Sequence, residues 1–231
     1  MQYQEQLLQI LKGPMVWIAL IIFISGIIVQ SIRLGRLTRK KEPAAITFAA
    51  NPRKKKKLTG WQRWVRPIAR MKTTALGASP ALSTISIIFH ICLFITPVFL
   101  MGHNVLIEAA VGVSIPYFSE NISDTLTVIV LMCGLFFLLR RFLLKRVRVL
   151  TTPYDIILLA VAILPFLTGI LAHYHLVWDY QLMILLHIAA GELMLIMIPF
   201  SKFFHMVFFF FGRFFIVNEY SLGAPKRTWQ F

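Results

Sequence analysis

The stretch of sequence that decides the fold is HIAAGELMLIMIPFSKFFHM, residues 187–206. It is apolar apart from one glutamate, one serine and one lysine, and it carries a histidine near each end. His187 and His205 are eighteen positions apart, which is about five turns of helix, so both rings would leave the same face. They would be separated by roughly 27 Å along the axis, most of a hydrocarbon core about 30 Å thick. We therefore predict a membrane-spanning helix with one histidine near each membrane surface.

The composition of the whole chain points to the same environment. Of its 231 residues, 58% are hydrophobic and only 14% are charged, and the mean hydropathy is +0.75. Such a chain has too little polar surface to cover a soluble globule, so most of it belongs in lipid. Cys92 and Cys133 lie in apolar runs without CxxC or CxxCH spacing. This pattern argues against covalently attached haem and against iron–sulfur clusters held by this chain.

Five apolar stretches are long enough to cross a bilayer, since a spanning helix needs about 20 residues. They show no period-two alternation, which argues against strands. The first is too long for a signal-peptide core and is expected to be retained. The sequence predicts an all-α, polytopic membrane protein, a bundle of five helices in a single membrane domain. The predicted spans are 14–32, 82–103, 125–144, 153–174 and 181–211, the last emerging as an interfacial helix.

The basic residues predict the orientation of these spans. If the five spans alternate, 23 of the 24 lysines and arginines lie on one side, and Lys12 alone lies on the other. Because such an excess marks cytoplasmic loops, the N-terminus is expected outside and the C-terminus inside. We expect a multi-pass membrane protein with a basic cytoplasmic loop at 33–80 and a cytoplasmic tail at 212–231. The net charge of +15 is then a topology signal, and a nucleic-acid partner is not expected.

The most basic segment, residues 51–72, is open to two interpretations. In the first it is a solvated loop whose two tryptophans sit at the lipid headgroups. In the second it is a docking surface for an acidic cytoplasmic partner. Attraction to anionic lipid accompanies either interpretation.

Four of the six histidines form two pairs by depth in the predicted topology. His103 and His187 fall near the outer face, and His90 and His205 near the inner face. Two pairs at two depths are what two stacked haems with bis-histidine ligation require, because haem iron takes axial imidazoles. The simpler alternative is that these histidines satisfy one another, or hydroxyl groups, inside a helix bundle.

The outer ligand from the second span raises a geometric difficulty. Thirteen residues separate His90 from His103, which leaves the two rings about 140° apart on an ideal helix. Pro97 and Gly102 lie between them, and a kink there would re-aim His103. Without that kink, His173 or His175 becomes the rival outer ligand.

This pattern resembles a known family, the dihaem cytochrome b subunit of respiratory nitrate reductase and the related membrane subunits of heterodisulfide reductases. The segment PFSKFFH, 199–205, is similar to the proline–phenylalanine–serine–lysine–histidine stretch that these cytochromes carry around the inner ligand. The resemblance covers roughly 82–213. The long basic segment 33–80 and the thirteen-residue spacing favour the heterodisulfide-reductase-like branch.

The resemblance implies an electron-transfer subunit of an oxidoreductase complex with two haem b groups, located in a prokaryotic inner membrane. Its donor is expected to be a quinol such as menaquinol, or a periplasmic multihaem cytochrome c. Its acceptor is expected to be a cytoplasmic iron–sulfur subunit of the heterodisulfide-reductase type. The quinone-site candidates are Glu108, His173 and His175, and the haem-propionate candidates are Lys202, Arg140, Arg141 and Arg213. Gly134, Gly169 and Gly191 are small residues that would admit either close helix packing or a porphyrin face.

Two other classes of function stay open at this stage. A proton or ion transporter would use Glu192 and the histidines as a relay within the membrane. The chain shows no internal repeat, which disfavours a transporter built from inverted repeats. A structural anchor that recruits a cytoplasmic enzyme through the basic loop would not need the four histidines.

Overall fold

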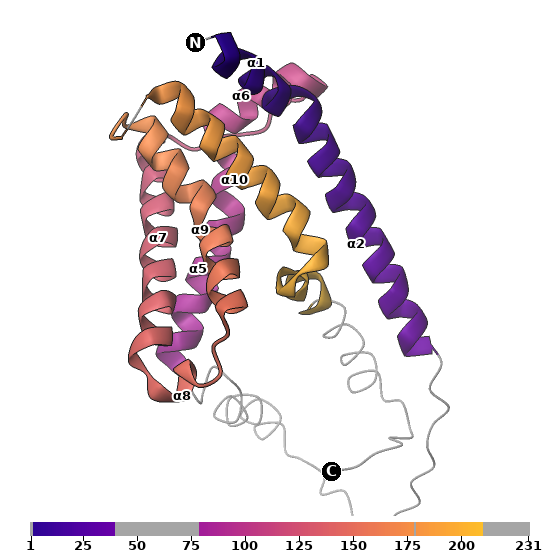
Figure 1. Ribbon diagram of the computed structural model, residues 1–231, viewed down its shortest axis with the longest axis vertical. Coiled ribbons are helices and arrows are strands. Elements are labelled where there is room, and N and C mark those ends of the chain that lie inside the picture. The colour runs from indigo at the N-terminus through magenta and orange to yellow at the C-terminus, as the bar shows by residue number, and fades with distance from the viewer. Residues whose placement is uncertain (1, 40–78, 178, 210–231) are drawn as a thin grey trace, which may run out of the picture. The chain divides into compact units, whose positions relative to one another are not determined.

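The structure is a computed structural model, and it describes residues 2–39, 79–177 and 179–209. Within these ranges the chain forms helices joined by short connections, and no strand occurs there. Five of the described helices are long and apolar enough to cross a membrane (Figure 1). The prediction of an all-α, five-span fold is confirmed, and the protein is a multi-pass membrane protein. Most of the predicted basic loop 33–80 and the whole tail 212–231 lie outside the described residues.

The observed spans overlap all five predicted ones. They are Gln6–Arg36, Pro80–Phe99, Glu120–Leu143, Pro153–His173 and Tyr180–Phe200. The elements in chain order are α1 (Gln2–Ile10), η1 (Leu11–Met15), α2 (Val16–Arg39), α5 (Pro80–Phe99), α6 (Met101–Val111), α7 (Glu120–Leu143), α8 (Lys145–Arg148), α9 (Pro153–His173), α10 (Tyr180–Phe200) and η2 (Lys202–Phe204). They group into two compact units that divide α10 between His187 and Ile188, and each unit is described by itself.

The first unit holds α1, η1, α2 and the second half of α10. Pro14 lies inside the helical run formed by α1, η1 and α2, and there the chain widens into a π-turn. A wider turn accommodates the missing proline N–H without ending the helix. Gly26 of α2 contacts α10 so closely that a Cβ there would lie 2.7 Å from the Pro199 ring. Gln30 adds a hydrogen bond, its Nε2 donating to the Pro199 carbonyl at 3.2 Å.

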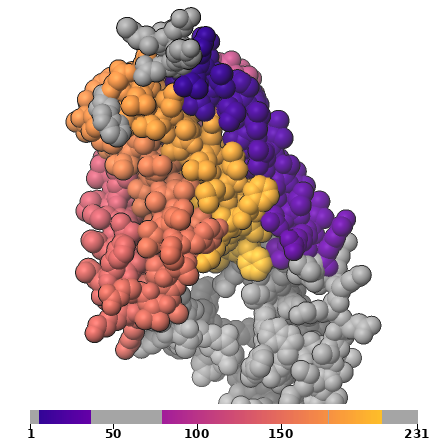
Figure 2. Space-filling model, viewed as in Figure 1, coloured from indigo at the N-terminus to yellow at the C-terminus, as the bar shows by residue number. Residues whose placement is uncertain are grey.

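The second unit holds α5 to α9 and the first half of α10. Helix α7 packs against both α5 and α9. The buried side chains at its centre are Phe89, Cys92, Val130 and Phe166. Many other large apolar side chains of the unit are exposed, as expected for helix faces turned to lipid. The side chains of α8 and α9 are seen on the outside of this unit in Figure 2.

Gly134 is the residue that lets α7 and α9 approach. A Cβ at this position would lie 2.7 Å from Cγ1 of Ile163, a separation that real Cβ atoms essentially never show. Of the two interpretations of Gly134, close helix packing is therefore the one that the structure displays.

The start of α9 is fixed by its own side chains. The hydroxyl of Thr152 accepts a hydrogen bond from the backbone N–H of Asp155, and the Asp155 carboxylate accepts one from the Thr152 N–H. This capping box satisfies two backbone donors that a helix leaves unpaired. Pro153 occupies the first turn, where its missing N–H costs nothing. Helix α9 thus begins at Pro153, the residue at which the sequence predicts the fourth span to start.

The second span ends earlier than predicted. Helix α5 stops at Phe99, Leu100 is extended with φ −76° and ψ 128°, and the short helix α6 then carries His103. The prediction of one continuous helix over 82–103 is wrong at this point. The break comes three residues after Pro97, at Leu100, and not at Gly102.

The fifth span is also broken. Helix α10 ends at Phe200, Ser201 is extended, and the Ser201 hydroxyl accepts a hydrogen bond from the Phe203 N–H at 3.1 Å. After the 3₁₀ turn η2, helix resumes at His205. The prediction of one continuous helix over 181–211 is therefore wrong, because the helix is interrupted between Phe200 and His205. A serine that caps the new turn is the physical reason, because its hydroxyl competes with the helix for backbone donors.

Candidate functional site

The predicted outer pair lies together in the second unit. The imidazole rings of His103 and His187 have centroids 5.9 Å apart and planes inclined by 23°. A metal ion holds imidazole nitrogen at about 2.0–2.1 Å, so two axial rings on one iron would have centroids about 6 Å apart. The observed centroid spacing is therefore one that two imidazoles bound to a single metal ion could have.

The two rings are held by the same kind of hydrogen bond. Nδ1 of His103 donates to the Pro97 carbonyl at 2.8 Å, and Nδ1 of His187 donates to the Pro165 carbonyl at 2.9 Å. Because a carbonyl only accepts, the proton of each neutral ring sits on Nδ1, and Nε2 keeps its lone pair. Histidines that bind metals are usually oriented in this way, with the second nitrogen donating to a carbonyl.

The break between α5 and α6 explains how His103 reaches this position. On a continuous helix His103 would have faced about 140° away from His90. In the structure the extended Leu100 redirects the chain, and the Pro97 carbonyl bonds to the ring of His103. The re-aiming expected from Pro97 occurs, although through a helix break instead of a kink.

On the other helix, Gly169 gives the ring of His187 room beside α9. A Cβ on Gly169 would lie 3.1 Å from Cε1 and 3.2 Å from Nδ1 of His187. The hydroxyl oxygen of Thr168 also lies 3.4 Å from Nδ1. The sequence reasoning marked Gly169 as a small residue in a span, but it missed Pro165 and Thr168. A proline within a predicted span, followed three residues later by a threonine, was the available signal.

The predicted inner ligands show the same hydrogen bonding, each within its own unit. Nδ1 of His90 donates to the Ser86 carbonyl at 2.6 Å, one turn earlier on α5. Nδ1 of His205 donates to the Lys202 carbonyl at 2.7 Å. In all four predicted ligands Nδ1 is therefore the protonated nitrogen of the neutral ring, and the lone pair is on Nε2. Because His90 and His205 belong to different units, their pairing stays a prediction.

The two rival outer ligands make other contacts. The ring of His173 contacts Tyr174, and the ring of His175 contacts Tyr180. His173 is half-exposed, and its Nε2 lies 3.8 Å from Asp124 Oδ2. His175 has a left-handed backbone with φ 51°. Between these candidates and His103, the ring that the structure places beside His187 is that of His103.

A polar cluster therefore surrounds His173, one of the quinone-site candidates. The phenol of Tyr174 donates to Asp124 Oδ2 at 2.6 Å, and this bond raises the pKa of Tyr174. Glu108, a second candidate, is exposed on α6, where its backbone carbonyl accepts from the Gly112 N–H at the helix end. Gly112 has φ 72°, a conformation that favours glycine.

The haem-propionate candidates lie at helix ends. Arg140 and Arg141 are in the last turn of α7, and Lys202 is in η2. Arg213 lies outside the described residues. Within the described ranges, no group of three or more histidine, cysteine, aspartate or glutamate side chains could hold a metal ion. An axial haem pair needs only two such side chains, so this result does not bear on it.

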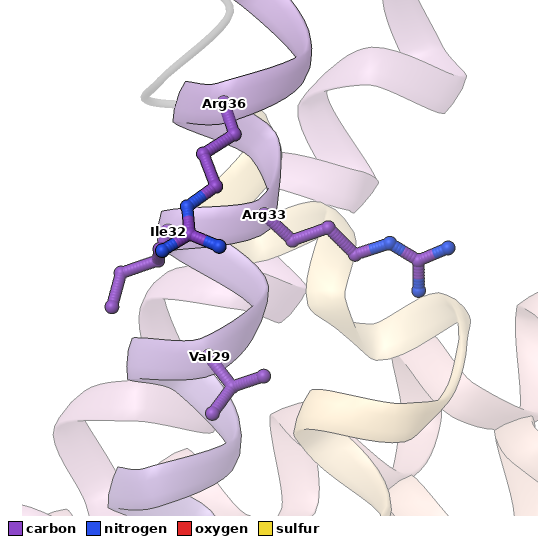
Figure 3. A pocket seen from close by; sticks show the side chains of 4 residues that line it. All are labelled: Val29, Ile32, Arg33 and Arg36. Carbon is purple, nitrogen blue, oxygen red and sulfur yellow. The ribbon is translucent and has the colours of Figure 1, made fainter.

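A shallow pocket lies elsewhere in the first unit, on α2. Val29, Ile32, Arg33 and Arg36 line it, and Figure 3 shows the two arginine side chains extending in different directions from the helix. Arginines above apolar residues at the end of a span are typical of snorkelling toward lipid headgroups. None of the predicted site residues lies in this pocket.

The fold defines the class as all-α, multi-pass membrane proteins, and within it the imidazole rings of His103 and His187 lie beside each other. The chain belongs to the same family as a protein of Nitratidesulfovibrio vulgaris (strain Hildenborough) that is described only as "Protein". The two are 36% identical over 226 residues, which cover 94% of this chain and 95% of that protein. No family model matches the chain, and no solved structure matches it.

Proposed function

We propose that the protein is a dihaem cytochrome b subunit of a membrane redox complex, of the heterodisulfide-reductase-like and nitrate-reductase gamma type. The observation that supports this most directly is the His103–His187 pair, with ring centroids 5.9 Å apart and both Nδ1 atoms bonded to carbonyls. The first haem b would be held by these two residues near the outer face. The second would be held by His90 and His205 near the inner face.

The two haem groups supply the one-electron redox chemistry when bound. The protein's own contribution is to hold four imidazoles in the ligating tautomer and to exclude water with apolar helices. Oxidation of a quinol releases two electrons and two protons, so a site on the outer side would deposit the protons outside. The electrons would pass inward to a cytoplasmic iron–sulfur subunit, with the N-terminus outside and the C-terminus inside.

The outer donor is proposed to be a quinol such as menaquinol. The polar cluster of His173, Asp124 and Tyr174 supports this choice, because a quinol hydroxyl needs a proton acceptor nearby. A periplasmic multihaem cytochrome c is the alternative donor, and it would need no quinone site. A quinol analogue that reduces the outer haem of the isolated subunit, and is blocked by a quinone-site inhibitor, would distinguish the two donors.

Haem content is the direct test of the proposed function. We expect the purified protein to release about two non-covalent haems per chain into acid acetone, because no CxxCH motif can tether them. Pyridine haemochrome spectra of the extract would measure this ratio. A chain that carries no haem when expressed with adequate haem supply would overturn the proposal.

Glu192 provides a specific reason to keep a proton-transporting function as the second candidate. This residue of α10 is buried, and its Oε1 has no hydrogen-bond partner among the described residues. The sequence predicted a neutral carboxyl or one bonded to a neighbouring span, and for Oε1 the described residues provide no such bond. An ionised carboxylate is costly in this setting, so we propose that Glu192 is neutral.

The Glu192→Gln variant tests which role this carboxyl has. If the residue is a neutral packing group, the variant keeps both haems and its electron-transfer rate stays within about twofold of the original, because the amide has nearly the same shape. Haem content and quinol-dependent reduction rate would be measured together. A collapse of the rate with both haems retained would instead assign Glu192 to a proton path.

A further inference from the structure

Four successive backbone carbonyls at the break between α5 and α6 all have hydrogen-bond partners. The Pro97 carbonyl accepts from Nδ1 of His103, and the Phe99 carbonyl accepts from the Phe118 N–H at 2.9 Å. The Val98 and Leu100 carbonyls both accept from the side chain of Asn104. A helix end with no water to bond needs such partners, because each unpaired carbonyl in an apolar environment is costly.

Asn104 makes the larger share of these bonds. Its Nδ2 donates to the Val98 carbonyl at 3.2 Å and to the Leu100 carbonyl at 3.3 Å, and its backbone N–H donates to the Leu100 carbonyl at 3.1 Å. The side chain is buried, with 2% of its surface exposed. One residue thus bridges the end of α5 and the start of α6.

The orientation of this amide is fixed by its surroundings. Both neighbours of Nδ2 are carbonyl oxygens, so turning the amide over would place Oδ1 against two acceptors. Oδ1 itself has no partner among the described residues. A buried acceptor without a donor is unfavourable, and an apolar side chain of similar size would avoid that penalty. The advantage of asparagine at this position therefore comes from its two Nδ2 hydrogens, which bond to the Val98 and Leu100 carbonyls.

We propose that Asn104 is the positioning residue of the outer haem ligand. Its hydrogen bonds to the carbonyls of Val98 and Leu100 fix the backbone conformation at the break between α5 and α6. In that conformation the Pro97 carbonyl lies within hydrogen-bond distance of Nδ1 of His103. The ring of His103 is thereby held beside His187. Asn104 touches neither iron nor substrate, and it acts through His103. The inference rests on the proposed function, since it concerns the ligand of a haem.

A graded set of variants tests the proposal. Asn104→Leu removes both donors. Asn104→Asp keeps the shape, and its carboxyl group, neutral in this buried position, keeps one O–H donor for the two carbonyls. Asn104→Ser keeps one donor, because a serine hydroxyl readily bonds the carbonyl four residues earlier, here that of Leu100. Thr127→Val is the matched control, since Thr127 is a buried polar residue of the same unit whose hydroxyl donates to the Ser123 carbonyl of its own helix, α7.

The readouts are haem content, a redox titration and the low-spin electron paramagnetic resonance signal of each haem in the purified protein. We expect Asn104→Leu to shift the resonance and midpoint potential of the outer haem most, or to lose that haem, and Asn104→Asp to shift them less, while the inner haem is unchanged. Asn104→Ser should lie between these variants and the original protein, and Thr127→Val should match the original. The retained inner haem shows that each variant is folded.

Two failures are distinguishable. If the original protein binds two haems but every Asn104 variant keeps an unshifted outer signal, the positioning role is overturned and the proposed function stands. If the original protein binds no haem, the proposed function fails. The contact itself is then tested in the haem-free chain by nitrogen NMR of labelled histidine. An unchanged Nδ1 resonance of His103 in Asn104→Leu would overturn the inference there as well.

Discussion

Replacing His187 with alanine is expected to remove the outer haem and leave the inner one in place, so that the haem content falls from about two per chain to about one. The reason is local, because the imidazole of His187 faces that of His103 at 5.9 Å and no other ring of the described residues contacts it. The electron-transfer rate from an outer donor should fall by at least about 100-fold. Pyridine haemochrome content and stopped-flow reduction would measure the two effects.

The reciprocal variant, His205→Ala, provides the control for this result. It is expected to lose the inner haem and keep the outer one, because the ligands at each depth act separately. Redox titration of each variant would then show one wave, with a different midpoint in each. If His205→Ala retained both haems, the inner ligand would be misassigned, and the resemblance carried by PFSKFFH would be weakened with it.

The spans were predictable from the sequence because the bilayer imposes a length and a composition on each of them. The first span was still underestimated, since Pro14 looks like a helix end while a π-turn carries the helix through it. The start at Pro153 was predictable because proline favours the first turn, and the capping box of Thr152 and Asp155 fixes that end. These features depend on residues close together in the chain.

The breaks in the second and fifth spans were not predictable in the same way. The sequence indicated that Pro97 would disturb α5, but the break at Leu100 also depends on Asn104 and on Phe118, which returns from the following loop. At Ser201 the hydroxyl accepts from the Phe203 N–H, and although Pro199 marks a weak point in α10, the sequence does not show that the helix stops just there. Hydropathy locates a span, whereas polar side chains decide where the helix within it stops.

The candidate site, too, was predictable in part from the sequence. Depth in the predicted topology placed His103 and His187 near the outer face, but it left His173 and His175 as rivals to His103, and only the structure shows that the ring of His103 lies beside that of His187. Their second hydrogen bonds did not follow, because the contact between His187 and Pro165 spans 22 residues and two helices. The room that Gly169 provides became visible only once α9 and α10 were placed side by side.

The second large effect that we expect is weaker binding of the outer haem in the Gly169→Val variant. A Cβ at this position would lie 3.1 Å from Cε1 and 3.2 Å from Nδ1 of His187, and the two valine methyl groups would add further contacts. The ring of His187 would have to move, and its bond to the Pro165 carbonyl would lengthen or break. Loss of such an orienting bond typically weakens metal binding by about 10- to 100-fold. Retention of the outer haem during purification and dilution should fall accordingly.

The control for this effect is Gly102→Val, because a Cβ on Gly102 meets nothing within 4 Å although the residue adjoins His103. Both variants introduce the same β-branched side chain into a helix, so their propensity costs are alike. Gly169→Ala should give an intermediate result, since its single methyl group requires the ring to yield by only a few tenths of an ångström. If Gly169→Val kept the outer haem as firmly as Gly102→Val does, the ring of His187 would not depend on its approach to α9. The Pro165 bond would then have no part in ligand orientation, and the fit of this pair to a haem would rest on ring spacing alone.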